Sequence, residues 1–368
     1  MIVGVPKEIK KDEYRVAIVP AGVRSLILSK VQVLIQTGAG EHSGISDDEF
    51  TKEGAEIVAT AEEVFDRADM IIKVKEPIGK ELVLLKPNQI LYTYLHLAAV
   101  PDVADALIKR EVTCVAYETV QLDNGSLPLL IPMSEVAGRM SVHEGAKYLE
   151  KERGGKGILL SGVPGVDSGR VVILGGGIVG TNAAKIAHGM GAQVTILDTN
   201  LPRLRYLDDI FQGRIKLLMS NTHNIMYSIK IADLIVGAVL IPGGSTPKLV
   251  TRDMLSAIPN GSVLVDVAVD QGGCFETTKP TSHSDPTFVV DGVTHYCVAN
   301  MPGAVPRTST FALTNATFPY AYKLATQGLC DALRASPPLS RGLNLHQGKV
   351  THEKVAQALN LNFEPVQF

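Results

Sequence analysis

The sequence predicts an α/β protein made of two doubly wound domains, one inserted in the other. Three observations carry this prediction. Short apolar runs rich in β-branched residues recur along the chain, helix-like segments separate them, and one long helical stretch from Met133 divides them into two series. A chain of 368 residues is long enough for two domains of ordinary size.

The first series of strands is expected within residues 1–130. Its runs are apolar without strict alternation, which is typical of parallel strands buried on both faces in βαβ units. They occupy residues 1–5, 32–38, 69–76, 89–95 and 112–118. The stretch "LDNGSLPLLIP" at 122–132 is rich in turn residues and predicts a crossing to the next domain.

The second series is expected within residues 131–305. A helix should open it, with Ser134 as its N-cap and Gly154-Gly155 at its end, because serine caps helix starts and glycine ends helices. Strands are then expected at 171–176, 193–198, 215–220, 233–240 and 262–270, with a last one within 294–306.

The C-terminal segment, 306–368, is expected to be helical. Its helical pattern is clearest over 308–333, and the segment is too short to form a domain. We therefore expect it to pack against residues 1–130, which leaves the second domain inserted in the first.

The composition favours a soluble, cytoplasmic protein. The formal net charge is −3 with both signs interspersed, which argues against nucleic acid and anionic membranes as partners. No apolar run approaches the roughly 20 residues of a membrane-spanning helix. The N-terminus also lacks the apolar core of a signal peptide. Four well-separated cysteines without a CxxC motif indicate reduced thiols: Cys114, Cys274, Cys297 and Cys330.

Residues 171–198 carry a dinucleotide-binding motif. A predicted strand runs into Gly175-x-Gly177-x-x-Gly180, a helix follows, and a second strand ends at Asp198. The glycines permit a tight turn, close approach of the backbone to a pyrophosphate, and close helix–strand packing. This context predicts a Rossmann-like site for NAD. Asp198 would accept the ribose hydroxyls and repel a 2′-phosphate, although two arginines shortly after it leave NADP open.

Charged residues also stand where predicted strands end. Arg15, the pair Lys73 and Lys75, and His96 do so in the first domain, and Asp270 does so in the second. Ligands of open α/β sheets bind beyond the carboxyl ends of strands, and an arginine with a lysine suits a small carboxylate. Each residue alone also has an ordinary explanation. It could be a solvated surface charge or, for the histidine, a core residue with a hydrogen-bond partner.

Seven segments together resemble the L-alanine dehydrogenase family, which is related to the NAD-binding subunit of proton-translocating transhydrogenase. The similarity extends from Met1 to about Leu345. The segments are "VPKEIKKDEYRVAIVP", "KVKEP", "YTYLHLA", "PMSEVAGRMSV", "GGGIVG", "VDVAVDQGG" and "NMPGAVPRTSTFALTN".

The resemblance implies roles for individual residues. Arg15 corresponds to the arginine that binds the substrate carboxylate, and Lys75 to the lysine that contacts the keto oxygen or its amine equivalent. His96 corresponds to the acid/base and Asp270 to the second catalytic residue. The implied cofactor contacts are Ser134, Gly175, Gly177, Ile178, Val179, Gly180, Asp198, Arg203, Ser220, Val239, Leu240, Val267, Ala268, Val269, Asp270, Lys279, Val298, Ala299, Asn300 and Met301.

No metal is expected. Some family members carry an acidic residue and a histidine as metal ligands in the last long helix, and this chain has Lys323 and Gln327 at those places.

The resemblance implies the reversible, NAD-dependent oxidative deamination of L-alanine to pyruvate and ammonia. It further implies a homohexamer whose partners are L-alanine, pyruvate and ammonium. Two alternatives stay open at this point. One is the NAD(H)-binding subunit of a transhydrogenase, which dehydrogenates no substrate of its own, and the other is a non-catalytic NAD-binding protein.

Overall fold

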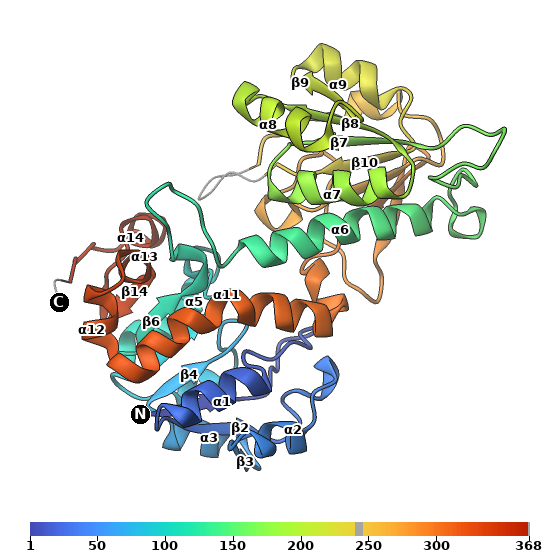
Figure 1. The fold of residues 1–368 in the computed structure, drawn as a ribbon. Helices are drawn as coiled ribbons and strands as arrows, with labels where there is room; N and C mark the ends of the chain where they lie inside the picture. Colours follow the sequence, from blue (N-terminus) through green and yellow to red (C-terminus); the bar gives the residue numbers. More distant parts are fainter. Residues whose placement is uncertain (240–245, 367–368) are drawn as a thin grey trace. The chain divides into compact units, whose positions relative to one another are not determined.

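The computed structural model describes residues 1–239 and 246–366 (Figure 1). The chain divides into two compact units. The first unit combines Met1–Met133 with Gly303–Phe368, and the second is Ser134–Pro302. Each unit has one predominantly parallel sheet with helices packed on it. The predicted fold class, α/β with two doubly wound domains of which one is inserted, is confirmed.

The sheet of the first unit has the order β15-β14-β6-β5-β4-β1-β2-β3 in the described part of the chain. Strands β1 to β6 run parallel, whereas β14 pairs antiparallel with β6 and β15 with β14. The strand order reverses between β1 and β4, which makes that position the topological switch point where ligands of such sheets bind. The strands are β1 (Ile2–Val5), β2 (Gln32–Gln36), β3 (Glu56–Val58), β4 (Met70–Ile72), β5 (Ile90–Thr93), β6 (Thr113–Ala116), β14 (Leu343–His346) and β15 (Lys349–Val350).

Both faces of this sheet are buried, which explains why its strands do not alternate in hydropathy. In β5, Ile90 and Tyr92 point into one hydrophobic cluster, and Leu91 points into the other. Because successive side chains of a strand lie on opposite faces, a strand covered on both sides is apolar throughout.

Helices cover the sheet of the first unit. Helix α11, drawn in orange, runs beside α1 in Figure 1, and both belong to the same packed layer. The C-terminal helices lie at the β14 end of the sheet in red. The helices are α1 (Pro20–Leu28), α2 (Asp47–Lys52), α3 (Ala61–Arg67), α4 (Glu81–Leu84), α5 (Pro101–Lys109), α11 (Pro306–Gln327), α12 (Leu329–Arg334), α13 (Pro337–Arg341) and α14 (Glu353–Leu359).

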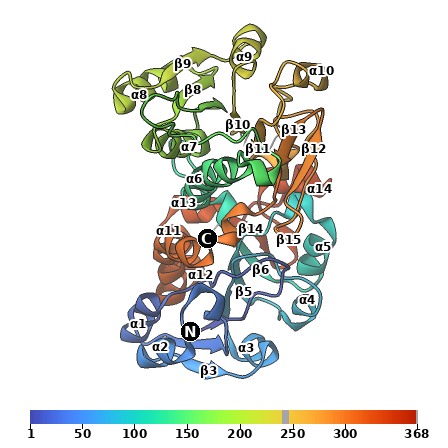
Figure 2. The same cartoon turned by 90° about the vertical axis from the view of Figure 1, so that its right-hand side faces the viewer.

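The sheet of the second unit has the order β12-β13-β11-β10-β7-β8-β9, with its switch point between β10 and β7. All pairs are parallel except the β12–β13 hairpin, which Figure 2 shows beside β11. The strands are β7 (Arg170–Leu174), β8 (Gln193–Asp198), β9 (Lys216–Met219), β10 (Leu234–Gly237), β11 (Val263–Asp266), β12 (Thr287–Val290) and β13 (Val293–Tyr296). The helices are α6 (Ile131–Tyr148), α7 (Ile178–Gly189), α8 (Leu201–Phe211), α9 (Thr222–Ile229) and α10 (Arg252–Leu255).

The structure corrects two local predictions. Helix α6 begins at Ile131, so Ser134 lies inside its first turns and is not the N-cap. Pro132 explains the earlier start, because proline suits a first helical turn, where its missing N–H has no partner to lose. The segment 306–368 is not wholly helical, since it also contributes β14 and β15 to the first sheet.

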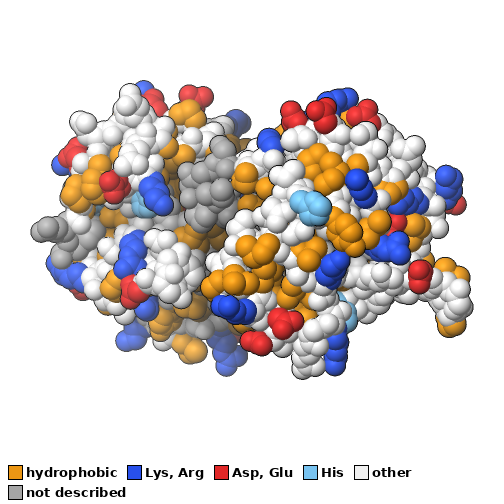
Figure 3. Space-filling view, turned by 90° about the horizontal axis from the view of Figure 1, so that it is seen from above, with side chains coloured by type: hydrophobic (Ala, Val, Ile, Leu, Met, Phe, Trp, Pro, Cys, Tyr) orange, Lys and Arg blue, Asp and Glu red, His pale blue; other side chains and the backbone are white. Residues whose placement is uncertain are grey.

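Surface and helix composition complete the description. Figure 3 shows acidic and basic side chains interspersed over one face of the molecule. Across 1–239 and 246–366, no helix is both long enough and apolar enough to span a bilayer.

Candidate active site

Three of the four predicted substrate and catalytic residues follow neighbouring strands of the first sheet. Arg15 follows β1, Lys75 follows β4, and His96 follows β5. Since these strands are parallel neighbours, all three residues leave the sheet at its carboxyl edge. The arginine and the lysine flank the switch point between β1 and β4, which is the expected position for ligand-binding groups.

Arg15 is a buried partner of Glu13, not a solvated surface charge. Only 2% of Arg15 is exposed, and its Nε donates to Glu13 Oε1 at 2.6 Å. A second contact joins Nη2 to the other carboxylate oxygen, so the pair is bidentate. Burial opposes ionisation of Glu13, yet the hydrogen bonds and charge of Arg15 lower its pKa below the ordinary value. The carboxylate therefore fixes the plane of the guanidinium.

Lys75 is a partly buried cation. Its Nζ lies 5.9 Å from the centroid of the Tyr94 ring, and no hydrogen bond or ion pair to this nitrogen occurs within the described residues. Burial, and then the charge of Arg15, lower the pKa of Lys75, while Glu13 acts in the opposite direction. A desolvated lysine beside an arginine has the chemistry of an anion-binding group.

The other lysine of this strand exit, Lys73, has a structural role. Its Nζ is buried between Glu81 at 2.7 Å and Glu8 at 3.1 Å. Glu8 also accepts a hydrogen bond from Val74 N at 2.6 Å, which fixes the backbone next to Lys75. The structure thus separates two lysines that the sequence placed together.

His96 is exposed, so the explanation of it as a core histidine is wrong. Its ring stacks on Tyr94 with centroids 5.7 Å apart and an interplanar angle of 7°. Its backbone has φ 50° and ψ 36°, the left-handed region, and its N–H donates to Glu118 Oε1 at 2.6 Å. The imidazole is available to a ligand.

The glycine motif has the geometry that a dinucleotide requires. Gly175 has φ 101°, a conformation that favours glycine. A Cβ on Gly180 would lie 1.8 Å from Gly175 O, so the helix packs directly on the turn. A Cβ on Gly177 would meet nothing within 4 Å, which leaves open space beside the N-terminus of α7. Amide donors and space for a pyrophosphate therefore coincide.

Asp198 and Arg203 are both tied to the glycine turn. Asp198 ends β8 and accepts from Gly176 N at 2.6 Å. Arg203 Nε donates to Gly176 O at 2.6 Å, and its Nη2 donates to Thr181 Oγ1 at 2.7 Å. Both side chains thus bind the backbone or a side chain of the glycine turn and the start of α7.

Asp270 is exposed in a short 3-10 turn, Val269–Gln271, after β11. A second aspartate, Asp266, builds this loop from inside. It is fully buried and accepts from Ala268 N at 3.1 Å and Cys274 N at 2.9 Å. Burial raises the pKa of Asp266 although these hydrogen bonds act against the increase.

Most other predicted cofactor residues lie where strands of the second sheet end. Ser220 follows β9, Val239 follows β10, Val267 and Ala268 follow β11, and the run Val298, Ala299, Asn300 and Met301 follows β13. Ile178 and Val179 open α7. Three residues do not fit this description: Ser134 is within α6, Lys279 lies over the Phe288 ring at 4.3 Å, and Leu240 is outside the described residues.

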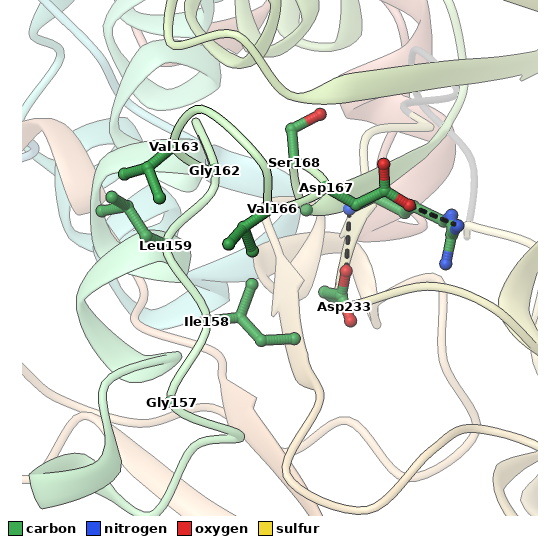
Figure 4. Close-up of a pocket in the computed structure, with 11 residues that line it drawn as sticks. Gly157, Ile158, Leu159, Gly162, Val163, Val166, Asp167, Ser168 and Asp233 are labelled. Carbon is green, nitrogen blue, oxygen red and sulfur yellow. Dashed lines mark hydrogen bonds and ion pairs between the residues drawn. The ribbon is translucent and has the colours of Figure 1, made fainter.

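A pocket of about 420 Å³ lies at the opposite edge of the second sheet (Figure 4). Two of its polar residues mark the starts of strands: Arg170 is the first residue of β7, and Asp233 directly precedes β10. Asp233 accepts hydrogen bonds from Arg170 N at 2.8 Å and from Lys156 Nζ at 2.7 Å. Because the glycine turn is at the carboxyl end of β7, this pocket is not part of the dinucleotide site.

Four carboxylates that organise these loops were missed from the sequence: Glu8, Glu13, Glu118 and Asp266. Only Glu13 had an available signal, because it lies two residues from Arg15. Glu8 and Glu118 act on partners 66 and 22 positions away, and Asp266 joins the nearby Ala268 N to Cys274 N, eight positions away; no spacing rule links the distant pairs.

Comparison with known proteins matches the whole chain. The family described as "Alanine dehydrogenase/PNT, N-terminal domain" matches residues 4–137, and "Alanine dehydrogenase/PNT, C-terminal domain" matches residues 141–353. An alanine dehydrogenase of Methanococcus maripaludis is 58% identical over 100% of this chain and 99% of its own. "Alanine dehydrogenase 2" of Staphylococcus aureus is 55% identical over the same shares.

Solved structures agree. An L-alanine dehydrogenase superposes with a TM-score of 0.95 at 50% identity, covering 98% of this chain and 99% of the other. A transhydrogenase from Sinorhizobium meliloti superposes with a TM-score of 0.82 at 24% identity, covering 96% and 99%. The second likeness concerns the fold alone.

Proposed function

The chain belongs to the alanine dehydrogenase/PNT family, and on that premise we propose that it catalyses the reversible, NAD-dependent oxidative deamination of L-alanine to pyruvate and ammonia. The observation that carries this proposal is the 58% identity with an alanine dehydrogenase over the whole chain. The transhydrogenase alternative is not favoured, because that similarity is limited to 24% identity.

The residues of the glycine turn fit NAD. Space at Gly177 and the amides at the start of α7 would hold the pyrophosphate, and Asp198 would accept hydrogen bonds from the ribose. NAD⁺ supplies the hydride acceptor. Arg203 is engaged by the turn, which supports NAD over NADP.

In the proposed mechanism, Arg15 and Lys75 hold the substrate. The guanidinium fixed by Glu13 would bind the carboxylate of alanine or pyruvate. Lys75, whose pKa is lowered by burial, would contact the carbonyl oxygen and stabilise charge that develops on it. Together they would fix the substrate Cα in one position, which is the entropic part of catalysis.

His96 would move the protons. Loss of hydride from Cα leaves an iminium, water adds to it, and the resulting carbinolamine expels ammonia. Addition of water needs a base, and departure of ammonia needs an acid. The exposed imidazole is suited to both steps, and Asp270 would assist by holding the amine or the attacking water.

We further propose that the protein is cytoplasmic and forms a homohexamer. Exposed apolar side chains on the second unit support self-association: Leu159, Val163 and Val166 are 62%, 54% and 64% exposed. Light scattering should give about 236 kDa, six times the 39.3 kDa chain. A mass of one chain at micromolar concentration would rule out the hexamer.

The activity is tested by absorbance at the NADH band. Purified protein with NAD⁺ and L-alanine should produce NADH, and pyruvate with ammonium should consume it. A panel of other small 2-amino acids, and NADP⁺ in place of NAD⁺, serve as controls. Absence of turnover in both directions, with NADH binding intact, would refute the dehydrogenase.

A further inference from the structure

Glu118 binds the backbone that carries His96. It lies in the 3-10 turn Tyr117–Thr119, directly after β6. Its Oε1 accepts from His96 N at 2.6 Å, and both oxygens lie 3.2 Å from Leu95 N. One carboxylate therefore receives two consecutive amides at the exit of the neighbouring strand, β5.

The conformation that Glu118 stabilises is an unfavourable one. His96 has φ 50° and ψ 36°, a region that residues other than glycine rarely adopt. Such conformations persist where the surroundings over-determine them, and they concentrate at functional sites. The hydrogen bond from His96 N to Glu118 Oε1, at 2.6 Å, ties this conformation to the neighbouring strand exit.

Separate contacts fix the imidazole and the following turn. The ring stacks on Tyr94, whose hydroxyl donates to Leu129 O at 2.6 Å. The turn Leu97–Ala99 is packed against α14. With the ring held at one end and the turn at the other, Glu118 supplies the constraint on the peptide between them.

We propose that Glu118 is a positioning residue: it holds His96 in the left-handed conformation that presents the imidazole to the substrate. This inference rests on the proposed function, in which His96 is the acid/base. The hydrogen bonds that Glu118 accepts come from the backbone amides of Leu95 and His96, and its proposed role is therefore to act through His96.

The first test compares three variants in alanine oxidation. Glu118→Ala should lower kcat by about 10- to 100-fold, because displacement of a catalytic group by about an ångström has effects of this size. NADH affinity should change by less than about twofold. Glu118→Gln should lower kcat less than Glu118→Ala does, because the amide oxygen of glutamine can still accept a hydrogen bond from His96 N.

Asp47→Ala is the matched control. Asp47, in α2 of the same unit, accepts hydrogen bonds from Gly38 N at 3.0 Å and from Thr37 Oγ1 at 2.7 Å, and neither partner is a proposed substrate residue. Asp47→Ala should lower the melting temperature about as much as Glu118→Ala does, and its kcat should stay within about twofold of the wild-type value. Equal losses of kcat in the two variants would reduce Glu118 to a stabilising residue and overturn the proposal.

A double variant and a crystal structure complete the test. In a His96→Ala background, Glu118→Ala should change residual turnover by less than about twofold, and a further tenfold loss would contradict the proposal. In a crystal structure of Glu118→Ala, His96 should leave the left-handed conformation. If His96 keeps its conformation in the variant, the proposal is overturned, whatever the activity of the wild-type protein. If the wild-type protein does not oxidise alanine, it is the proposed function that is refuted.

Discussion

The two sheets present the same kind of edge and hold it in different ways. In the first unit the loops after β1, β4 and β5 are fixed by buried or partly buried charges, such as the Glu13–Arg15 pair. In the second unit the loop after β7 is fixed by glycines, of which Gly180 touches Gly175 O. One edge depends on charge compensation, and the other depends on the absence of side chains.

This difference fits the ligands proposed for the two edges. A pyrophosphate needs backbone amides at close range, and glycine provides that approach. A small carboxylate needs a fixed cation, and a fixed cation in a buried place needs its own counter-charge. Variants in the first unit should therefore act through electrostatics, and variants in the second should act through steric collision.

The largest expected effect is on catalysis in the first unit. His96→Ala should lower turnover by about 10²–10⁴-fold, as for loss of a general acid/base, with folding and NADH binding nearly unchanged. Steady-state kinetics, melting temperature and NADH fluorescence titration check this result. Near-normal turnover would mean that the proton carrier is another residue.

Next in size is a loss of stability at Lys73. Lys73→Met should destabilise the protein by about 3–5 kcal/mol, because it leaves Glu8 and Glu81 buried without their cation. Lys75→Met, two positions away, is the matched control: it removes a cation without an ion-pair partner in the described chain, so it should stabilise the fold and abolish activity. Urea unfolding measures both, and equal destabilisation would contradict the distinction.

The glycine edge is tested by a steric pair. Gly180→Ala should cost about 1–3 kcal/mol of stability, because its Cβ would collide with Gly175 O. Gly177→Ala should fold normally, since its Cβ enters open space, yet weaken NADH binding, because the proposed pyrophosphate position is in that space. Tight NADH binding by Gly177→Ala would show that the pyrophosphate does not bind at this position.

The smallest effect is a pH dependence. The pKa of Lys75 in the folded protein is below its ordinary 10.5. At pH values between the folded-state pKa and 10.5, the unfolded chain therefore binds more protons than the folded protein. Wild-type stability should therefore rise through this interval relative to Lys75→Met. The advantage of the variant, a few degrees in melting temperature at neutral pH, should shrink as the pH approaches 10.5. A constant difference from pH 7 to 10.5 would show that the lysine is not desolvated.

The fold was largely predictable from local sequence patterns, whereas the contacts between residues distant in sequence were not predictable. The glycine turn was readable because its residues act on one another within a few positions. The distinction between Lys73 and Lys75 was not, because it depends on which way each side chain points. Strands β3, β12, β14 and β15 were also missed, since each has two to four residues and no periodicity of its own.

The same reasoning applies to the site. Residue type and resemblance predicted Arg15, Lys75, His96 and Asp270 as the reactive groups. Glu118 was not predicted, because its partner is 22 positions away and its oxygens bind main-chain amides that have no sequence signature. The side chains proposed to meet the substrate could be named from residue type and resemblance, whereas the side chains that hold them depend on the folded backbone.

The pairing of β14 with β6 has a consequence for biosynthesis. Leu345 lies opposite Cys114, and the whole second unit is made between them. Because a chain emerges from the ribosome N-terminus first, the contiguous second unit is complete while β6 still presents an unpaired edge. Unpaired edges are templates for aggregation, so the nascent chain carries this exposure until residues beyond 343 emerge. The first unit, whose synthesis starts first, is thus the unit whose sheet is completed last.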